Sequence, residues 1–171
     1  MKRLVAILAA LCVGLTALAQ EEDPWARIVA GDRLPAFEVA LTDGTTLSSL
    51  QLEGKVVWIA LWASWCPSCR KEFKRLEANK EFAELFENED FIFLPIAREE
   101  NIATVAAWLR KKGYTWPSGV DPTREIYALF AEHEIPRNII VGRDGVVVLH
   151  RTTYSKGDLG EIIEKAKEML N

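Results

Sequence analysis

Apolar side chains along the chain form two kinds of pattern: short continuous runs and stripes with helical spacing. Continuous runs at 56–62 and 91–97 are rich in β-branched and aromatic residues, which predicts strands buried on both faces. Apolar residues three or four positions apart predict amphipathic helices that begin at Pro67 and at residue 101. The first of these stripes changes phase, which predicts a break between residues 77 and 80.

The other predicted elements are shorter and are bounded by turn residues. Strands joined by helices, followed by a hairpin and a last helix, indicate an α/β sandwich without a second domain. These elements are a strand at 34–41, a return strand and helical turn at 45–52, an extended piece at 114–120, a helix at 123–131, hairpin strands at 138–141 and 146–150, and a last helix from Asp158 to residue 170.

The first residues have the pattern of a secretory signal peptide, with a basic start, an apolar stretch at 4–18 and an A-x-A cleavage motif. We therefore predict a signal peptide at 1–19 that is cleaved after Ala19, a flexible leader at 20–32, and one domain at 33–171. An uncleaved membrane anchor is an alternative, although about fifteen apolar residues are few for a spanning helix. Lipidation at Cys12 is a second alternative, and the bulky leucine before Cys12 argues against it.

The charge and the cysteine content of the chain limit the functions that can be expected of it. The 171 residues carry a formal charge of −4, so the basic face that nucleic-acid binding needs is not predicted. Of the three cysteines, Cys12 leaves with the signal peptide, and an exported protein keeps Cys66 and Cys69. A bridge between them closes so small a loop that it stabilises the fold little. We therefore expect these two cysteines to serve redox chemistry, without a cofactor.

The C-x-x-C motif opens the helix that Pro67 begins. Cys66 is then at the helix cap, where unpaired N–H groups and the helix dipole favour a thiolate. It can attack a substrate disulfide, and Cys69, three residues on, can resolve the mixed disulfide. A zinc site and an inert structural disulfide are the alternatives. A zinc site needs four ligands, and the chain has no second C-x-x-C.

Residues 62–73, with the sequence W-A-S-W-C-P-S-C-R-K-E-F, resemble the active-site signature of the thioredoxin superfamily. The chain is most similar to the exported TlpA/ResA-like thiol–disulfide oxidoreductases. The likeness extends from about residue 31 to 170 and includes L-P-A-F at 34–37, G-K-V-V at 54–57, I-P-R-N at 135–138 and G-R-D-G at 142–145.

The resemblance implies a thioredoxin-like three-layer sandwich, with a central mixed sheet flanked by helices and an N-terminal β-hairpin extension. It implies that Cys66 is the attacking cysteine and Cys69 the resolving one. Pro136 is implied to have a cis peptide bond that aims the backbone of Ile135 at the substrate.

The residues around the motif are given roles by the same resemblance. Trp65 and Pro67 are expected to form the active-site wall, with Trp65 shielding the thiols while Cys66 stays reachable. Trp62 is expected to pack in the core.

Glu72 lies one turn after Cys69 and is expected on the same face of the helix. A carboxyl group there, partly removed from water, would disfavour a neighbouring thiolate and could accept or deliver the proton of Cys69. Ala60 stands where thioredoxin has a buried aspartate, so Glu72 is the candidate for a proton shuttle. Lys74 stands where relatives often have a kinking proline, and this departure concerns the geometry of the helix. The alternative is a solvated glutamate paired with Arg75.

The sequence thus predicts a periplasmic thiol–disulfide oxidoreductase that acts on protein thiols and disulfides. The resemblance favours the reducing direction, in cytochrome c maturation or disulfide repair, with a membrane thiol transporter as redox partner and a monomeric state. A disulfide-forming oxidant, a thiol peroxidase and a redox-linked binding or chaperone module are alternatives. The peroxidase is disfavoured because Ala63 stands where a T-x-x-C motif has threonine.

Overall fold

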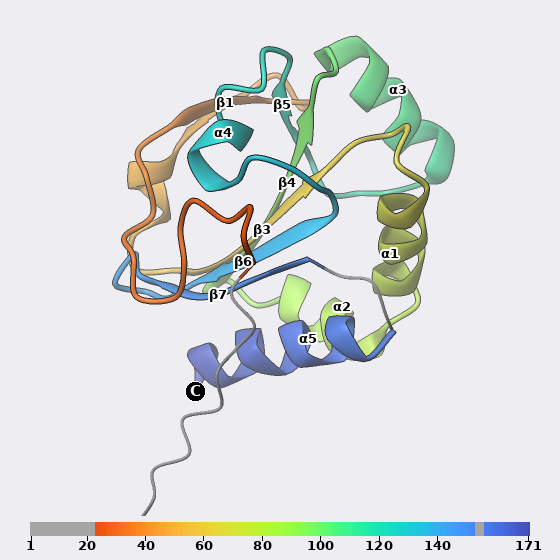
Figure 1. The fold of residues 1–171 in the computed structure, drawn as a ribbon. Helices are drawn as coiled ribbons and strands as arrows, with labels where there is room; N and C mark the ends of the chain where they lie inside the picture. The colour runs from red at the N-terminus through yellow and green to blue at the C-terminus, as the bar shows by residue number, and fades with distance from the viewer. Residues whose placement is uncertain (1–22, 153–155) are drawn as a thin grey trace, which may run out of the picture.

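The computed structural model describes residues 23–152 and 156–171 (Figure 1), so the predicted signal peptide at 1–19 lies outside the described residues. Within them, seven strands form one mixed sheet in the order β2-β1-β5-β4-β3-β6-β7. The strands are β1 (Glu38–Leu41), β2 (Thr46–Ser48), β3 (Val56–Trp62), β4 (Phe91–Arg98), β5 (Gly119–Asp121), β6 (Arg137–Val141) and β7 (Val147–Thr152).

Helices cover both faces of this sheet (Figure 1). One layer contains α1, α2, α3 and α5, and the other contains α4, the 3-10 turn η1 and the N-terminal segment. The result is the three-layer sandwich that the sequence predicts. The helices are α1 (Pro67–Glu77), α2 (Lys80–Phe86), α3 (Ile102–Lys112), α4 (Tyr127–Phe130) and α5 (Lys156–Leu170), and η1 is Ser49–Leu52.

The central strand β3 has the bounds that its apolar run predicts, and all seven of its residues are buried. It pairs in parallel with β4 and antiparallel with β6. Trp58 and Trp62 face the layer of α1, while Ile59 and Leu61 face the opposite layer. Because both faces are covered, the end of β3 is held firmly where the chain leaves for the C-x-x-C motif.

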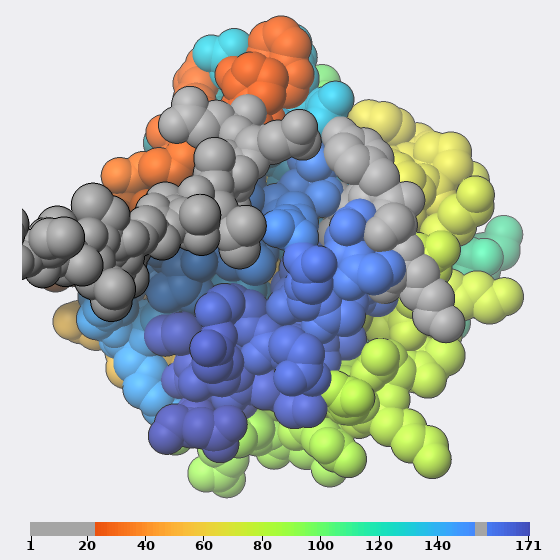
Figure 2. Space-filling view, turned by 60° about the horizontal axis from the view of Figure 1, so that its bottom comes forward, coloured from red at the N-terminus to blue at the C-terminus, as the bar shows by residue number. Residues whose placement is uncertain are grey.

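The predicted break between α1 and α2 is confirmed. The helix α1 ends at Glu77, and Asn79 begins α2 by accepting a hydrogen bond from the N–H of Phe82 on its side-chain oxygen at 2.9 Å. Farther along, α2 lies beside α5 on the surface (Figure 2), where Lys167 pairs with Glu81 at 3.0 Å.

Several predicted elements are shorter in the structure. The strand predicted at 34–41 begins only at Glu38, because the N–H of Leu34 donates to Gly145 and that of Phe37 to the Ser49 hydroxyl instead of to a neighbouring strand. The extended piece predicted at 114–120 forms a ladder only in β5.

The helices predicted at 123–131 and from Asp158 onward start elsewhere than predicted. The helix predicted at 123–131 is reduced to α4, because Arg124 has a left-handed backbone with φ of 66°, which interrupts a right-handed helix. The last helix starts at Lys156, and Asp158 lies in its first turn instead of capping it.

The segment 23–33 packs against the domain. The backbone forms isolated bridges between Ala26 and Ala131 and between Arg33 and Val146. The N–H of Arg27 also donates to the carbonyl of Phe130 at 2.8 Å. The part of the expected loose leader that the structure describes, 23–32, is therefore packed against the domain, and residues 20–22 lie outside the described residues.

His150 in β7 joins this segment to the sheet. Its Nδ1 lies 2.8 Å from the carbonyl oxygen of Ile28, and its Nε2 lies 3.4 Å from the Arg137 guanidinium. Burial lowers the pKa of His150 below its ordinary value of 6.5, and the charge of Arg137 adds to this. The contact with Ile28 and the charge of Asp23 act in the opposite direction but do not reverse it.

We predict that His150 makes the protein less stable in mild acid. The unfolded chain binds a proton near pH 6.5 and the folded chain resists it, so stability falls as the pH drops below that value. The substitution His150→Asn can still donate to Ile28 but cannot become charged. Its melting temperature should therefore fall less than that of the parent between about pH 7 and pH 5.

The control for this experiment is His133→Asn, which removes the only other histidine of the chain, an exposed one. Equal pH dependence in the parent and in His150→Asn would contradict the prediction.

Candidate active site

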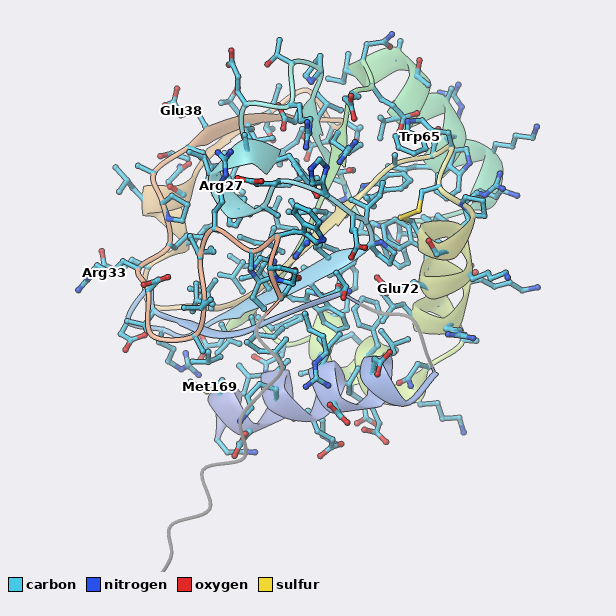
Figure 3. All side chains as sticks on the ribbon, in the orientation of Figure 1. Arg27, Arg33, Glu38, Trp65, Glu72 and Met169 are labelled. Carbon is cyan, nitrogen blue, oxygen red and sulfur yellow. A yellow bond between two sulfur atoms is a disulfide. The ribbon has the colours of Figure 1, made fainter. Side chains whose placement is uncertain are left out.

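The two cysteines of the motif lie at the N-terminus of α1, where they form a disulfide with Cα atoms 5.3 Å apart (Figure 3). Cys66 is the N-cap residue, and its sulfur accepts a hydrogen bond from the N–H of Cys69 at 3.2 Å. The Ser68 hydroxyl lies 3.2 Å from the same sulfur. Pro67 occupies the first turn, as predicted, and the helix N–H that points at the Cys66 sulfur is that of Cys69.

The two cysteines differ in exposure. Cys66 is 4% exposed and Cys69 is fully buried. Any group that approaches from solvent therefore meets Cys66 first.

A loop from the far end of the chain lies against the disulfide. The Ile135–Pro136 peptide bond is cis, as the resemblance implies. The carbonyl oxygen of Ile135 lies 3.8 Å from the sulfur of Cys66. The structure thus brings together the C-x-x-C motif and the predicted proline loop, which are about seventy residues apart in the sequence.

Glu72 lies inside the protein, between α1 and the sheet (Figure 3), and is only 4% exposed. It shares the buried face of α1 with Cys69. Its Oε1 accepts a hydrogen bond from the side-chain amide of Asn138 at 3.1 Å, and the oxygen of that amide accepts one from the Trp58 indole at 2.6 Å. Asn138 pairs with Ala60 across β3 and β6. The alternative of a solvated Glu72 paired with Arg75 is therefore wrong.

The two tryptophans of the motif differ in environment. Trp62 is fully buried, as predicted, and its indole donates to Ser118 at 3.1 Å. Trp65 is 53% exposed, and the guanidinium of Arg98 lies over its ring at 5.9 Å. The same guanidinium lies 4.5 Å from the ring centre of Tyr127, so Arg98 joins the motif to α4.

A buried carboxylate holds the turn that leads into the motif. Glu100, two residues after the end of β4, accepts hydrogen bonds from the N–H and the hydroxyl of Ser64, the first at 2.6 Å. Two acceptor bonds from one residue fix the backbone two positions before Cys66.

A second charged group lies directly behind the proline loop. Arg137 is fully buried and pairs with Asp23 of the N-terminal segment at 2.5 Å. Partial burial would raise the pKa of Asp23, but hydrogen bonds from Arg137 and the Trp25 N–H, and the charge of Arg137, hold it below its ordinary value.

Several of these residues escaped the sequence analysis. Asn138 and Arg137 are polar residues in a run that is otherwise apolar, and Glu100 lies two residues after a buried strand, so the sequence carries a signal for each of them. The pairing of Arg137 with Asp23 has no local signal, because 114 positions separate the two.

The described part of the chain contains neither a metal-binding cluster nor a membrane-spanning helix. No group of three His, Cys, Asp or Glu side chains is arranged to hold a metal ion within 23–152 and 156–171. No helix in these ranges has the length and apolar character needed to cross a membrane.

Comparisons with known proteins agree with this geometry. The family described as Redoxin matches residues 29–166. A thiol-disulfide oxidoreductase ResA of Halalkalibacterium halodurans is 23% identical over 141 residues, which cover 82% of this chain and 77% of the relative. A ResA of Bacillus thuringiensis subsp. konkukian is 23% identical over 164 residues, which cover 94% of this chain and 93% of the relative.

A solved structure agrees over most of the fold. The solution structure of a candidate protein disulfide isomerase from Bacteroides thetaiotaomicron superimposes with a TM-score of 0.79. It is 33% identical, and the match covers 85% of this chain and 92% of that one. The chain therefore belongs to the Redoxin family, and it is a TlpA/ResA-like thiol–disulfide oxidoreductase with the thioredoxin-like fold.

Proposed function

We propose that this oxidoreductase works in the periplasm as a reductant of protein disulfides, with Cys66 as the attacking cysteine and Cys69 as the resolving one. The observation that carries the proposal is the disulfide at the N-terminus of α1, where Cys66 is the outer sulfur and lies against the Ile135 carbonyl. The helix N-terminus stabilises negative charge on Cys66, which is the charge that both the nucleophile and the leaving group develop.

The exchange proceeds in two steps. The Cys66 thiolate attacks one sulfur of the substrate disulfide, a mixed disulfide forms, and the other substrate sulfur leaves as a thiolate. Cys69 then loses its proton and attacks the Cys66 sulfur, which expels the second substrate thiolate. The substrate gains two electrons, and the enzyme ends with the Cys66–Cys69 disulfide.

Glu72 serves in the second step as the acceptor of the Cys69 proton. Its burial on the Cys69 face of α1 supports this role, because a desolvated carboxylate binds a proton more readily than one in water. Asn138 supports it by fixing the carboxylate from the neighbouring strand.

Substrate binds along the surface formed by Trp65, Pro67 and the half-buried Ile135, while Pro136, which is buried, aims the backbone of Ile135 at the substrate. The exposure of Trp65 and Pro67 next to Cys66 supports this surface. An extended substrate segment pairs with the backbone of Ile135, which brings its disulfide to Cys66.

The proposed location and redox direction are supported by the N-terminal sequence pattern and by the family resemblance. The signal-like residues 1–19 support export, and relatives named thiol-disulfide oxidoreductase ResA support exchange chemistry on thiols and disulfides. The resemblance to ResA-like proteins favours the reducing direction, in cytochrome c maturation or disulfide repair. Each turnover leaves the enzyme oxidised, so a membrane thiol transporter resupplies two electrons. The protein acts as a monomer.

The first prediction from the proposed function concerns the two cysteines. In an insulin-reduction assay, Cys66→Ala should lower the rate to that of the reaction without enzyme, because no nucleophile remains at the helix cap. Cys69→Ala should instead accumulate mixed disulfides, visible on non-reducing gels, because nothing resolves them. Insulin reduction by Cys66→Ala at the parent rate would contradict the assignment.

The second prediction concerns direction. A redox titration against glutathione or dithiothreitol should give a potential near that of thioredoxin, about −270 mV. A good reductant has a dithiol form that is unstable relative to its disulfide form, which makes the potential low. A value near that of DsbA, about −120 mV, would show that the protein is an oxidant.

The third prediction concerns Glu72. The variant Glu72→Gln keeps an acceptor for Asn138 but carries no charge, so thiolate should form at lower pH. The alkylation rate of the reduced protein, measured against pH, should therefore shift to lower pH. The exposed Glu77 of the same helix provides the control, as Glu77→Gln. An unchanged profile in Glu72→Gln would remove this carboxylate from the mechanism.

A further inference from the structure

The loop at 132–136, which ends at Pro136, is held from outside by side chains. Three consecutive backbone carbonyls of this loop each accept a hydrogen bond from a side chain that lies outside the loop, before or after it in the sequence. Connecting loops run over the surface and are usually more mobile than the elements they join, so three such bonds in a row hold this loop in place. The three bonds join Arg124 to Glu132, Arg137 Nε to His133 at 2.7 Å, and the Tyr127 hydroxyl to Glu134 at 2.5 Å.

Tyr127 is itself held on several sides. The residue is fully buried, and its N–H donates to the Asp121 carboxylate at 2.7 Å. The guanidinium of Arg98 lies over its ring, 4.5 Å from the ring centre, and the same guanidinium contacts Trp65. The hydroxyl of Tyr127 therefore has little freedom, and the Glu134 carbonyl that it binds is held with it.

Arg137 is anchored from a distant part of the chain. Its guanidinium is fully buried and pairs with Asp23, so that one end faces the loop and the other the N-terminal segment. A buried guanidinium needs a carboxylate partner to offset its lost hydration. Asp23 therefore keeps Arg137 in the position from which Nε reaches His133.

The next residue of the loop contacts the reacting sulfur. The carbonyl of Ile135 directly follows the clamped Glu134 carbonyl, and its oxygen lies 3.8 Å from the Cys66 sulfur. A carbonyl oxygen carries partial negative charge, so it favours a neutral thiol beside it and disfavours a thiolate. The position of this loop therefore influences how readily Cys66 ionises and how substrate backbone meets Ile135.

We propose that Tyr127 and Arg137 are positioning residues for thiol–disulfide exchange, which hold the loop at 132–136 against Cys66, and that Asp23 of the N-terminal segment completes this site by holding Arg137. The part that concerns substrate rests on the proposed function. The part that concerns the ionisation of Cys66 does not.

The variant Tyr127→Phe tests the proposal, because it removes one hydroxyl and keeps the ring under Arg98. Two quantities are measured. The first is the ratio of kcat/KM for insulin to kcat/KM for the small disulfide 5,5′-dithiobis(2-nitrobenzoic acid), which makes little use of a backbone surface. The second is the pH profile of Cys66 alkylation in the reduced protein, which needs no substrate.

We expect the ratio of kcat/KM for insulin to kcat/KM for the small disulfide to fall about two- to ten-fold, the range that the loss of one hydrogen bond covers. We also expect the alkylation profile to shift to lower pH, because a loosened Ile135 carbonyl no longer disfavours the thiolate. Loss of stability alone would move neither quantity at temperatures where the variant remains folded.

The variant Asp23→Asn removes the charge that holds Arg137 and should move the same quantities in the same direction. If Tyr127→Phe fails to fold, the Asp23→Asn variant still tests the proposal. The matched control is Asp32→Asn, a carboxylate of the same segment that caps the N–H of Val29 and does not contact the loop.

The proposal is overturned if both quantities in the folded Tyr127→Phe and Asp23→Asn variants equal those of Asp32→Asn. It stands if either quantity moves as stated. If the parent itself does not reduce insulin, the proposed function fails, and the alkylation profile alone decides the inference.

Discussion

The burial of β3 on both faces is the constraint on which the rest of the structure depends. Its seven residues are enclosed between the two layers and between the neighbouring strands β4 and β6. A strand held on four sides cannot shift along its axis without exposing apolar side chains or breaking both ladders. The end of β3 is therefore a rigid point, and the C-x-x-C motif begins four residues beyond it. The two reactive cysteines are therefore held in place by the end of β3.

The same packing means that buried polar side chains need hydrogen-bond partners inside the protein. Where charged or amide side chains lie in the core, they must find hydrogen bonds there, because an unpaired buried polar group is costly. Glu72 meets Asn138 beneath the disulfide, Arg137 meets Asp23 behind the proline loop, and Glu100 holds the turn at Ser64. Each pair connects the active-site region to a different segment, so the site is supported from several directions.

Much of the site was predictable from short-range patterns. The cap position of Cys66, the place of Pro67 in the first turn and the end of α1 before Asn79 all depend on residues within a few positions of one another. The short elements were predicted less well. The helix expected at 123–131 is interrupted because Arg124 takes a left-handed backbone while its guanidinium bonds to Glu132, a contact that no local propensity encodes.

The sequence by itself determined the order of strands and helices, the buried central strand and the pairing of two cysteines at a helix start, because these follow from local spacing and hydrophobic period. Only the tertiary structure decided which distant groups meet there. Ile135 reaches Cys66, and Asn138 reaches Glu72, because antiparallel pairing of β6 with β3 sets their register. Asp23 reaches Arg137 because a fully buried charge needs a counterion, and the fold brings the N-terminal segment to it.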